Sequence, residues 1–170
     1  MAGLTTPRIT PQKLDGDFGT KLGPIGVAAS QTLYVGAVVC TNPSGHIVPG
    51  STGASLICQG VFGNQPNVVP AGSLVSSSVA GTTVVEIDRG TFFLDNDPTA
   101  PLSAADIGHA CMLNDDHTVS KLSLTNASRC IAGTVVGVNA TGTSEPIGLG
   151  VWVKLGSVQP FQGTGMGQYV

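Results

Sequence analysis

The side chains best suited to acid–base or metal chemistry gather in one stretch of this 170-residue sequence, between positions 86 and 116. The stretch has one Lys or Arg residue, Arg89, against seven carboxylates: Glu86, Asp88, Asp95, Asp97, Asp106, Asp115 and Asp116. Paired carboxylates can act as general acid and base, or bind calcium. However, neither acidic cluster has the Gly and Glu that an EF-hand loop requires at its sixth and twelfth positions. Asp95-Asn96-Asp97-Pro98 and Asn114-Asp115-Asp116 have the composition of turns, in which Asx side chains bond their own backbone. We therefore expect turn-forming and solvated carboxylates, with a bound cation as the alternative.

The other candidates for catalysis are the histidines and the nucleophiles. His46, His109 and His117 form no HExxH or HxH pattern. His117 follows Asp116 and could form a metal pair with a third ligand from elsewhere, although we favour a turn histidine. Nucleophilic catalysis needs a Ser, Cys or Thr beside a base, and the sequence has no GxSxG motif. The glycine-rich residues 163–167 lack the lysine of a P-loop. The sequence thus predicts a protein that is not an enzyme and needs no cofactor or metal.

The four cysteines are Cys40, Cys58, Cys111 and Cys130. They are widely spaced, with no CxxC pair, which argues against a zinc site. Each lies in an apolar, strand-like run, so we expect four reduced, buried thiols. Reduced thiols fit synthesis in the cytoplasm, where disulfides are rare.

Composition sets the fold class and excludes several partners. With 41% hydrophobic residues, 24 Gly and 11 Pro, the chain has a core but frequent turn signals, which favours many short strands over long helices. A net charge of −3 with seven scattered Lys and Arg residues argues against nucleic-acid binding. The sequence has no stretch of 18 apolar residues, so we expect no membrane span. The N-terminal residues lack the apolar region of a signal peptide. Only 10% of residues are charged, which suggests that an assembly covers part of the surface.

The chain divides into three predicted parts. Residues 1–32 contain Pro7, Pro11 and Pro24 but no apolar period, and we expect an extended N-terminal arm. Residues 33–155 are predicted to form one all-β body, a small, strongly bent β-barrel or β-sandwich, because glycines recur in its strands and mark bends or bulges. Residues 156–170 form a Gly-rich, flexible C-terminal tail.

Within the body, apolar β-branched runs predict the strands. The expected strands lie within residues 33–41, 55–64, 82–95, 109–113, 118–122, 129–139 and 147–155. One short helical turn is expected at Ser103–Asp106, where a serine precedes a carboxylate by three residues as in a capping box, and Gly108 would end it. The predicted core residues are Leu33, Tyr34, Val38, Phe92, Phe93, Val135, Val138 and Trp152.

The order of motifs resembles that of the head decoration (cement) proteins of tailed bacteriophages. The matching segments are an arm ending in Asp15-Gly16-Asp17-Phe18, LYVGAVVCTNPSGHIVPG at 33–50, EIDRGTFFLDND at 86–97, LSAADIGHACMLNDDHTVSK at 102–121, and the closing strands at 132–138 and 150–155. The resemblance covers about residues 33–155 with an added N-terminal arm, which is most of the chain. Its Arg89-Gly90 unit and its Asp115-to-Val119 unit carry most of the specificity.

This resemblance implies a structural virion protein, made in the host bacterial cytoplasm and located on the outer capsid surface. Its implied partners are the major capsid protein and sister copies in a homodimer or homotrimer. We expect contacts from the arm and the tail, at Thr6, Pro7, Arg8, Ile9, Pro11, Leu14, Phe18, Phe161 and Tyr169. A virion-exposed carbohydrate-binding or adhesin-like module is the first alternative, and a metal-dependent hydrolase that uses the acidic segment is the second.

Overall fold

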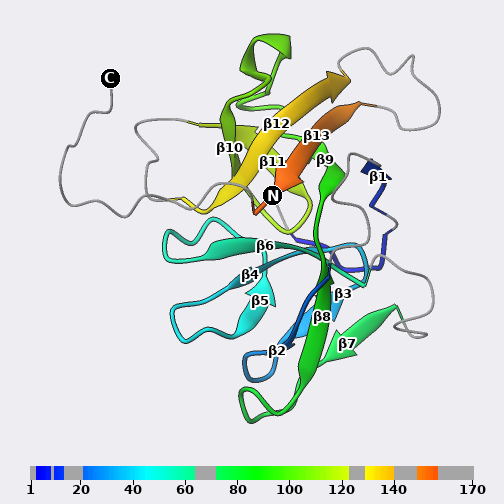
Figure 1. The fold of residues 1–170 in the computed structure, drawn as a ribbon, viewed down its shortest axis with the longest axis vertical. Helices are drawn as coiled ribbons and strands as arrows, with labels where there is room; N and C mark the ends of the chain where they lie inside the picture. Colours follow the sequence, from blue (N-terminus) through cyan, green and yellow to red (C-terminus); the bar gives the residue numbers. More distant parts are fainter. Residues whose placement is uncertain are drawn as a thin grey trace, which may run out of the picture.

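A computed structural model describes residues 3–8, 10–13, 21–63, 72–122, 129–139 and 149–156. Within them the chain is all-β, with one 3₁₀ turn, as predicted (Figure 1). The elements are β1 (Gln12–Lys13), β2 (Lys21–Gly26), β3 (Thr32–Tyr34), β4 (Val38–Thr41), β5 (Ile47–Pro49), β6 (Ile57–Phe62), β7 (Ser73–Val75), β8 (Val84–Asp88), β9 (Thr91–Asn96), η1 (Ala104–Asp106), β10 (Ala110–Leu113), β11 (Thr118–Lys121), β12 (Ile131–Asn139) and β13 (Gly150–Leu155).

The C-terminal half of the body is a closed barrel. Strands pair in the order β9-β11-β10-β12-β13, and β13 pairs again with β9 to close the ring. β1 lies against β9 at Thr91 and Phe92, whereas β11 pairs with β9 farther along, at Asp95 and Asn96. β1 therefore pairs with the barrel from outside and is not one of the strands that close it.

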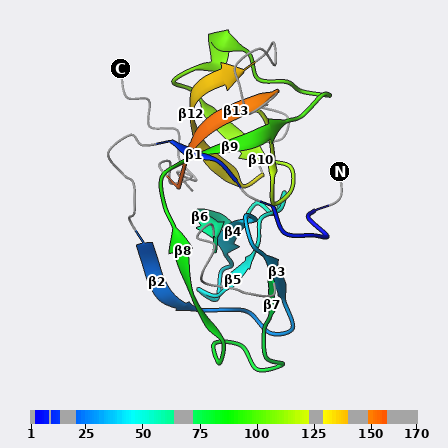
Figure 2. The same ribbon diagram turned by 90° about the vertical axis from the view of Figure 1, so that its right-hand side faces the viewer.

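The N-terminal half forms a five-stranded sheet in the order β2-β8-β6-β4-β5, with β3 and β7 as a separate pair. The barrel is stacked on this sheet, and the two views agree on that arrangement (Figures 1 and 2). Both faces of the sheet are buried at its strand β4. On β4, Val38 and Cys40 join the core shared with the barrel, whereas Val39, between them, joins a second core on the opposite face. This two-sided burial explains why the sequence there is a continuous apolar run.

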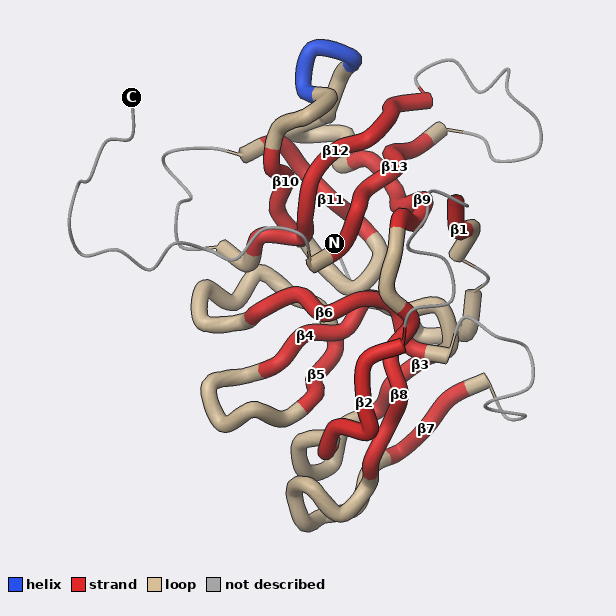
Figure 3. Tube along the Cα trace, in the orientation of Figure 1, coloured by secondary structure: helices blue, strands red, loops and turns tan. Residues whose placement is uncertain are grey.

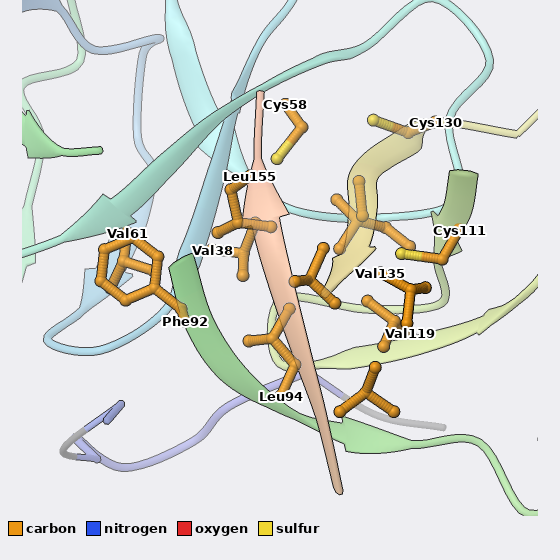
Figure 4. Close-up of a cluster of buried hydrophobic side chains, with 14 of the residues drawn as sticks. Val38, Cys58, Val61, Phe92, Leu94, Cys111, Val119, Cys130, Val135 and Leu155 are labelled. Atoms are coloured by element: carbon orange, nitrogen blue, oxygen red, sulfur yellow. The ribbon is translucent and has the colours of Figure 1, made fainter. Parts of the chain in front are cut away.

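The larger core fills the barrel and its junction with the sheet. Figure 4 shows Phe92 and Leu94 of β9 close to Val38 of β4 and Val61 of β6. The second core, beneath the sheet, contains Val27, Leu33, Val39, Ile47, Phe62, Val85 and Ile87. Of the predicted core residues, Leu33, Val38, Phe92, Phe93 and Val135 are buried. Tyr34, Val138 and Trp152 are only partly buried, and the Trp152 ring meets Phe93 edge-on at 5.2 Å between centroids.

The expected glycine-associated bends are present as shifts in strand register. The β4–β6 pairing shifts between Val39, which faces Gly60, and Cys40. The β10–β12 pairing shifts beside Gly133, and the β12–β13 pairing shifts between Val135 and Gly137. Each bulge inserts an extra residue into one strand and increases its local twist. Such twisting allows five short strands to close into a ring.

Two sequence predictions, one about a strand and one about where the β body begins, are wrong. Residues 33–41 are not one strand, because Val35–Ala37 turn the chain between β3, which pairs with β7, and β4, which pairs with β5 and β6. The body also begins earlier than residue 33. β2 pairs with β8, and Val27 is 1% exposed in the second core. Pro24 lies within β2 and does not prevent its pairing with β8, because β2 is an edge strand, where a missing N–H is tolerated.

The predicted helical turn is confirmed. Ser103 donates from its main-chain N and from Oγ to Asp106 Oδ2, at 2.9 and 2.8 Å. The Lys121 ammonium lies 2.8 Å from the other oxygen of Asp106. This hydrogen bond, with those from Ser103, lowers the pKa of Asp106 to about 2. η1 stands at one extremity of the molecule (Figure 3).

Candidate functional site: the N-terminal strap and its carboxylate–histidine node

The described N-terminal residues, 3–8 and 10–13, form a strap that runs over the junction between sheet and barrel. Arg8 N donates to Val35 O at 2.9 Å. The fully buried Thr10 donates from Oγ1 to Gly36 O at 2.6 Å. Phe93 N then donates to Pro11 O at 2.8 Å, where β1 begins to pair with β9. The strap therefore joins the two halves of its own chain.

Two further contacts bind the strap to acidic side chains of the barrel. Leu4 N donates to Asp116 Oδ1 at 2.7 Å. The Arg8 guanidinium uses Nη1 and Nη2 to hold both carboxylate oxygens of Asp95, at 3.1 and 3.3 Å. This is the two-pronged geometry in which arginine binds a carboxylate most strongly.

The acidic residues that hold the strap belong to a compact group of Asp95, Asp115, Asp116 and His117, which we term the node. Asp115 Oδ1 accepts main-chain N–H groups from His117 and Thr118, at 3.0 and 2.7 Å, and so shapes the turn between β10 and β11. His117 Nδ1 lies 3.0 Å from Asp116 Oδ1 and 3.2 Å from Asp115 Oδ1. Its Nε2 lies 3.9 Å from Asp95 Oδ2.

This geometry raises the pKa of His117 above its usual value of 6.5. The hydrogen bond with Asp116 is the main cause, and the charges of Asp115, Asp116 and Asp95 act in the same direction against the cost of burial. A protonated His117 places one positive charge among three carboxylates. With Arg8 bound to Asp95, two positive charges then face three carboxylates, so the negative charge of the node is partly neutralised where it holds the strap.

The same atoms allow a test of the metal alternative. Asp115, Asp116 and His117 each offer a ligand atom within 4.8 Å of the others. However, the oxygens that face His117 already accept N–H groups from Leu4, His117 and Thr118, and the separations from Nδ1 are those of hydrogen bonds. His117 is thus hydrogen-bonded to Asp116 through Nδ1, with Asp115 Oδ1 close to the same nitrogen. It lies between β10 and β11, at the turn position expected from the sequence.

Other carboxylates of the 86–116 stretch also serve local structure or ion pairs. Asp97 Oδ1 accepts from Thr99 N at 3.0 Å, an Asx turn. Lys21 lies 3.3 Å from Glu86 and 3.9 Å from Asp88, joining β2 to β8. The bonds of Asp97, Asp106 and Asp115 support the predicted turn-forming roles. The expectation of solvated carboxylates is wrong for five of the seven, because hydrogen bonds and ion pairs replace water around side chains that are at most 7% exposed: Asp88, Asp97, Asp106, Asp115 and Asp116. Asp95 and Asn96 lie in β9 rather than in a turn.

The predicted contact residues have mixed placements. Thr6 and Pro7 are exposed on the strap, whereas Arg8 and Pro11 are partly buried against the body. Ile9, Leu14, Phe18, Phe161 and Tyr169 lie outside the described residues. The expectation that Arg8 reaches a partner is not supported by its geometry, because its guanidinium is bound to Asp95 of the same chain.

The four cysteines are free and buried, as expected. Two of them also meet although they are 90 positions apart in the sequence, because Cys40 Sγ of β4 lies 3.8 Å from Cys130 Sγ beside β12. Burial raises the pKa of the Cys111 thiol to about 12. Cys111 therefore acts as a small apolar side chain and is a poor nucleophile, whereas the hydrogen bond with Cys40 lowers the pKa of Cys130.

Sequence reasoning did not foresee the exposed apolar side chains. They form two groups: Val75, Val79 and Val84 around the connection from β7 to β8, and Ile107, Leu122 and Leu149 near η1 and the start of β13. The β7–β8 connection lies at the bottom of Figure 1, and η1 and the start of β13 lie at the top. A shallow cavity of about 300 Å³, lined by Asp106, His109, Ala110, Lys121 and Leu122, adjoins the second group.

Comparison of the chain with family models, with curated proteins and with solved structures finds no match. Among the described residues, no helix has the length and apolar character needed to cross a membrane. The function must therefore be inferred from the residues themselves.

Proposed function

We propose that this protein is a non-enzymatic decoration protein of a tailed-phage head, which binds the outer capsid surface and bridges major capsid protein subunits. The order of motifs supports the proposal through its resemblance to cement proteins. The observation that carries it is the pair of apolar groups at opposite ends of one body. A bridging protein needs two contact surfaces that face away from each other, and a single ligand site would not require them.

Each of the six apolar side chains in these two groups is at least 44% exposed. Val75, Val79 and Val84 are 70, 64 and 57% exposed, and Leu149 at the other end is 66% exposed. Single exposed apolar residues are ordinary, but grouped ones mark interaction sites. Burying three valines exposed to this degree contributes about 3 kcal/mol before the costs of association.

So small a contribution suits a protein that acts in many copies. Each copy holds its neighbours weakly, but binding only to the assembled shell shifts the equilibrium toward assembly. The exposed strap residues Thr6 and Pro7 add a third contact in this proposal, beside the junction of sheet and barrel.

The test is to add purified protein to heads that lack it and to measure binding and the melting temperature of the shell. Val79→Asp and Ile107→Asp each place a charge in one apolar group. If the protein bridges subunits, each variant alone should lose the rise in melting temperature that the native protein gives. Ser44→Asp is the control, since Ser44 is exposed in the turn between β4 and β5, outside both apolar groups. Heads stabilised equally by the native protein and by both variants would refute the bridging role.

A further inference from the structure

A second, polar cavity lies where the barrel meets the sheet. Its volume is about 280 Å³, and its described lining is Thr52, after β5, with Asp97, Thr99, Asn114 and Arg129 of the barrel half. This volume corresponds to about nine water molecules at ~30 Å³ each. The cavity can therefore admit one amino-acid side chain.

Arg129 is the distinctive residue of this cavity. Its Nη1 donates to the amide oxygen of Asn114 at 2.8 Å. Within the described chain it is in no ion pair, in contrast to Arg8 with Asp95, Lys21 with Glu86 and Lys121 with Asp106. A guanidinium carries five N–H donors, and among the described residues only the bond from Nη1 to Asn114 is formed.

The residues behind Arg129 hold it in place. Asn114 Oδ1 accepts from Arg129 and from Ser120 Oγ, while its Nδ2 donates to Asp97 Oδ2 at 2.6 Å. Asp97 is only 6% exposed, and its other oxygen accepts from Thr99 N. The carboxylate is thus enclosed and occupied.

The groups that remain for a ligand are donors. Arg129 is partly exposed, and the side chains of Thr52 and Thr99 are exposed. Because a hydroxyl can donate and a guanidinium only donates, these three favour an acceptor with negative charge. A carboxylate meets this requirement, since two parallel N–H groups of arginine match its two oxygens.

We infer that this cavity binds the carboxylate of an Asp or Glu side chain presented by the capsid surface. The choice of the capsid as its source rests on the proposed function, whereas the carboxylate chemistry rests on the cavity alone. Asn114 is a positioning residue in this site, because it orients the guanidinium without reaching the ligand. The contact would lie between the two apolar ends and fix the orientation in which the protein docks.

The chemistry is tested by nuclear magnetic resonance titration with two peptides, acetyl-Gly-Glu-Gly-amide and acetyl-Gly-Gln-Gly-amide. The Glu peptide should give saturable shifts at the amides of Thr52, Thr99 and Asn114, and the Gln peptide should not. Arg129→Gln should remove these shifts. Arg129→Lys should keep part of them, because it preserves the charge and loses the two-pronged geometry. Arg89→Gln makes the same charge change outside the cavity and should bind as the native protein does.

The source is tested by binding to heads that lack the protein. Arg129→Gln should bind at least tenfold more weakly than the native protein, with Arg89→Gln unchanged. Absence of shifts with the Glu peptide overturns the site itself. Peptide shifts together with unaltered head binding by Arg129→Gln overturn the capsid as the source. If the native protein fails to bind heads while the peptide shifts persist, the proposed function and the capsid source both fail and the carboxylate chemistry stands.

Discussion

Replacement of Gly36 by alanine tests whether the strap is held as the structure shows. Gly36 has φ +86°, and a Cβ at this position would overlap the carbonyl group of Arg8 in the strap. Gly45 is the matched control, since its φ is +79° and a Cβ there meets nothing within 4 Å. Both substitutions force alanine into the left-handed region, at a cost of about 1–2 kcal/mol. Only Gly36→Ala must also displace the strap.

The additional cost follows from the bonds that the displaced strap would lose. Arg8 N to Val35 O, at 2.9 Å, and Thr10 Oγ1 to Gly36 O, at 2.6 Å, lie on either side of the overlap. Each is worth about 1 kcal/mol net, so Gly36→Ala should destabilise the protein by about 2 kcal/mol more than Gly45→Ala. Urea unfolding of the two variants measures this difference.

Trypsin provides a second and local assay. Cleavage after Arg8 requires the strap to leave the body, and its rate follows the population of the open form. A difference of about 2 kcal/mol corresponds to roughly 30-fold faster cleavage after Arg8 in Gly36→Ala than in Gly45→Ala. Equal stability of the two variants, with equal cleavage at Arg8, would show that these contacts do not hold the strap.

Three further predictions concern the node and the cores. Because the folded state raises the pKa of His117 above 6.5, protonation stabilises the fold fully below pH 6.5, and this stability is lost as pH rises through the folded pKa. His117→Gln should flatten that fall in urea unfolding measured across the same pH range, and an unchanged slope would contradict the role of the node. Phe92→Ala, at a fully buried site between barrel and sheet, should cost about 3–5 kcal/mol, whereas Val79→Ala at its exposed site should change the stability by less than about 0.5 kcal/mol. The four buried thiols should react with Ellman's reagent only as fast as the protein unfolds, and a rapid burst of even one thiol in the native protein would contradict their burial.

The sequence predicted those parts of the fold that local pattern determines. The β-rich runs at 55–64, 109–113 and 129–139 became β6, β10 and β12 because apolar and β-branched residues alternate or bulge there within a few positions. The capping pattern of Ser103 and Asp106 needed no partner from elsewhere, and it formed the expected turn. The burial of the four cysteines could also be predicted, since each lies inside an apolar run.

What escaped prediction depends on contacts between distant segments. The Arg8–Asp95 pair joins residues 87 positions apart, and nothing near Arg8 indicates that its partner is on its own chain. Likewise, the sequence of β2 by itself is typical of a proline-containing arm, and it forms a strand because it pairs with β8, about 60 positions away. The Arg129 cavity needs Thr52 from one half and Asn114 from the other. Such sites arise from the packing of the halves, for which a single sequence has no local signal.

The pairing of β1 with β9 also has a consequence for the protein during synthesis. Gln12 faces Phe92, so the ribosome must add 80 more residues before the partner of Gln12 exists. At 5–20 residues per second, that interval is roughly 4–16 s. Strands β2 to β8 pair among themselves and are translated within the same interval. The nascent chain can therefore complete its first sheet while β1 remains unpaired, and the strand translated first is among the last to be placed.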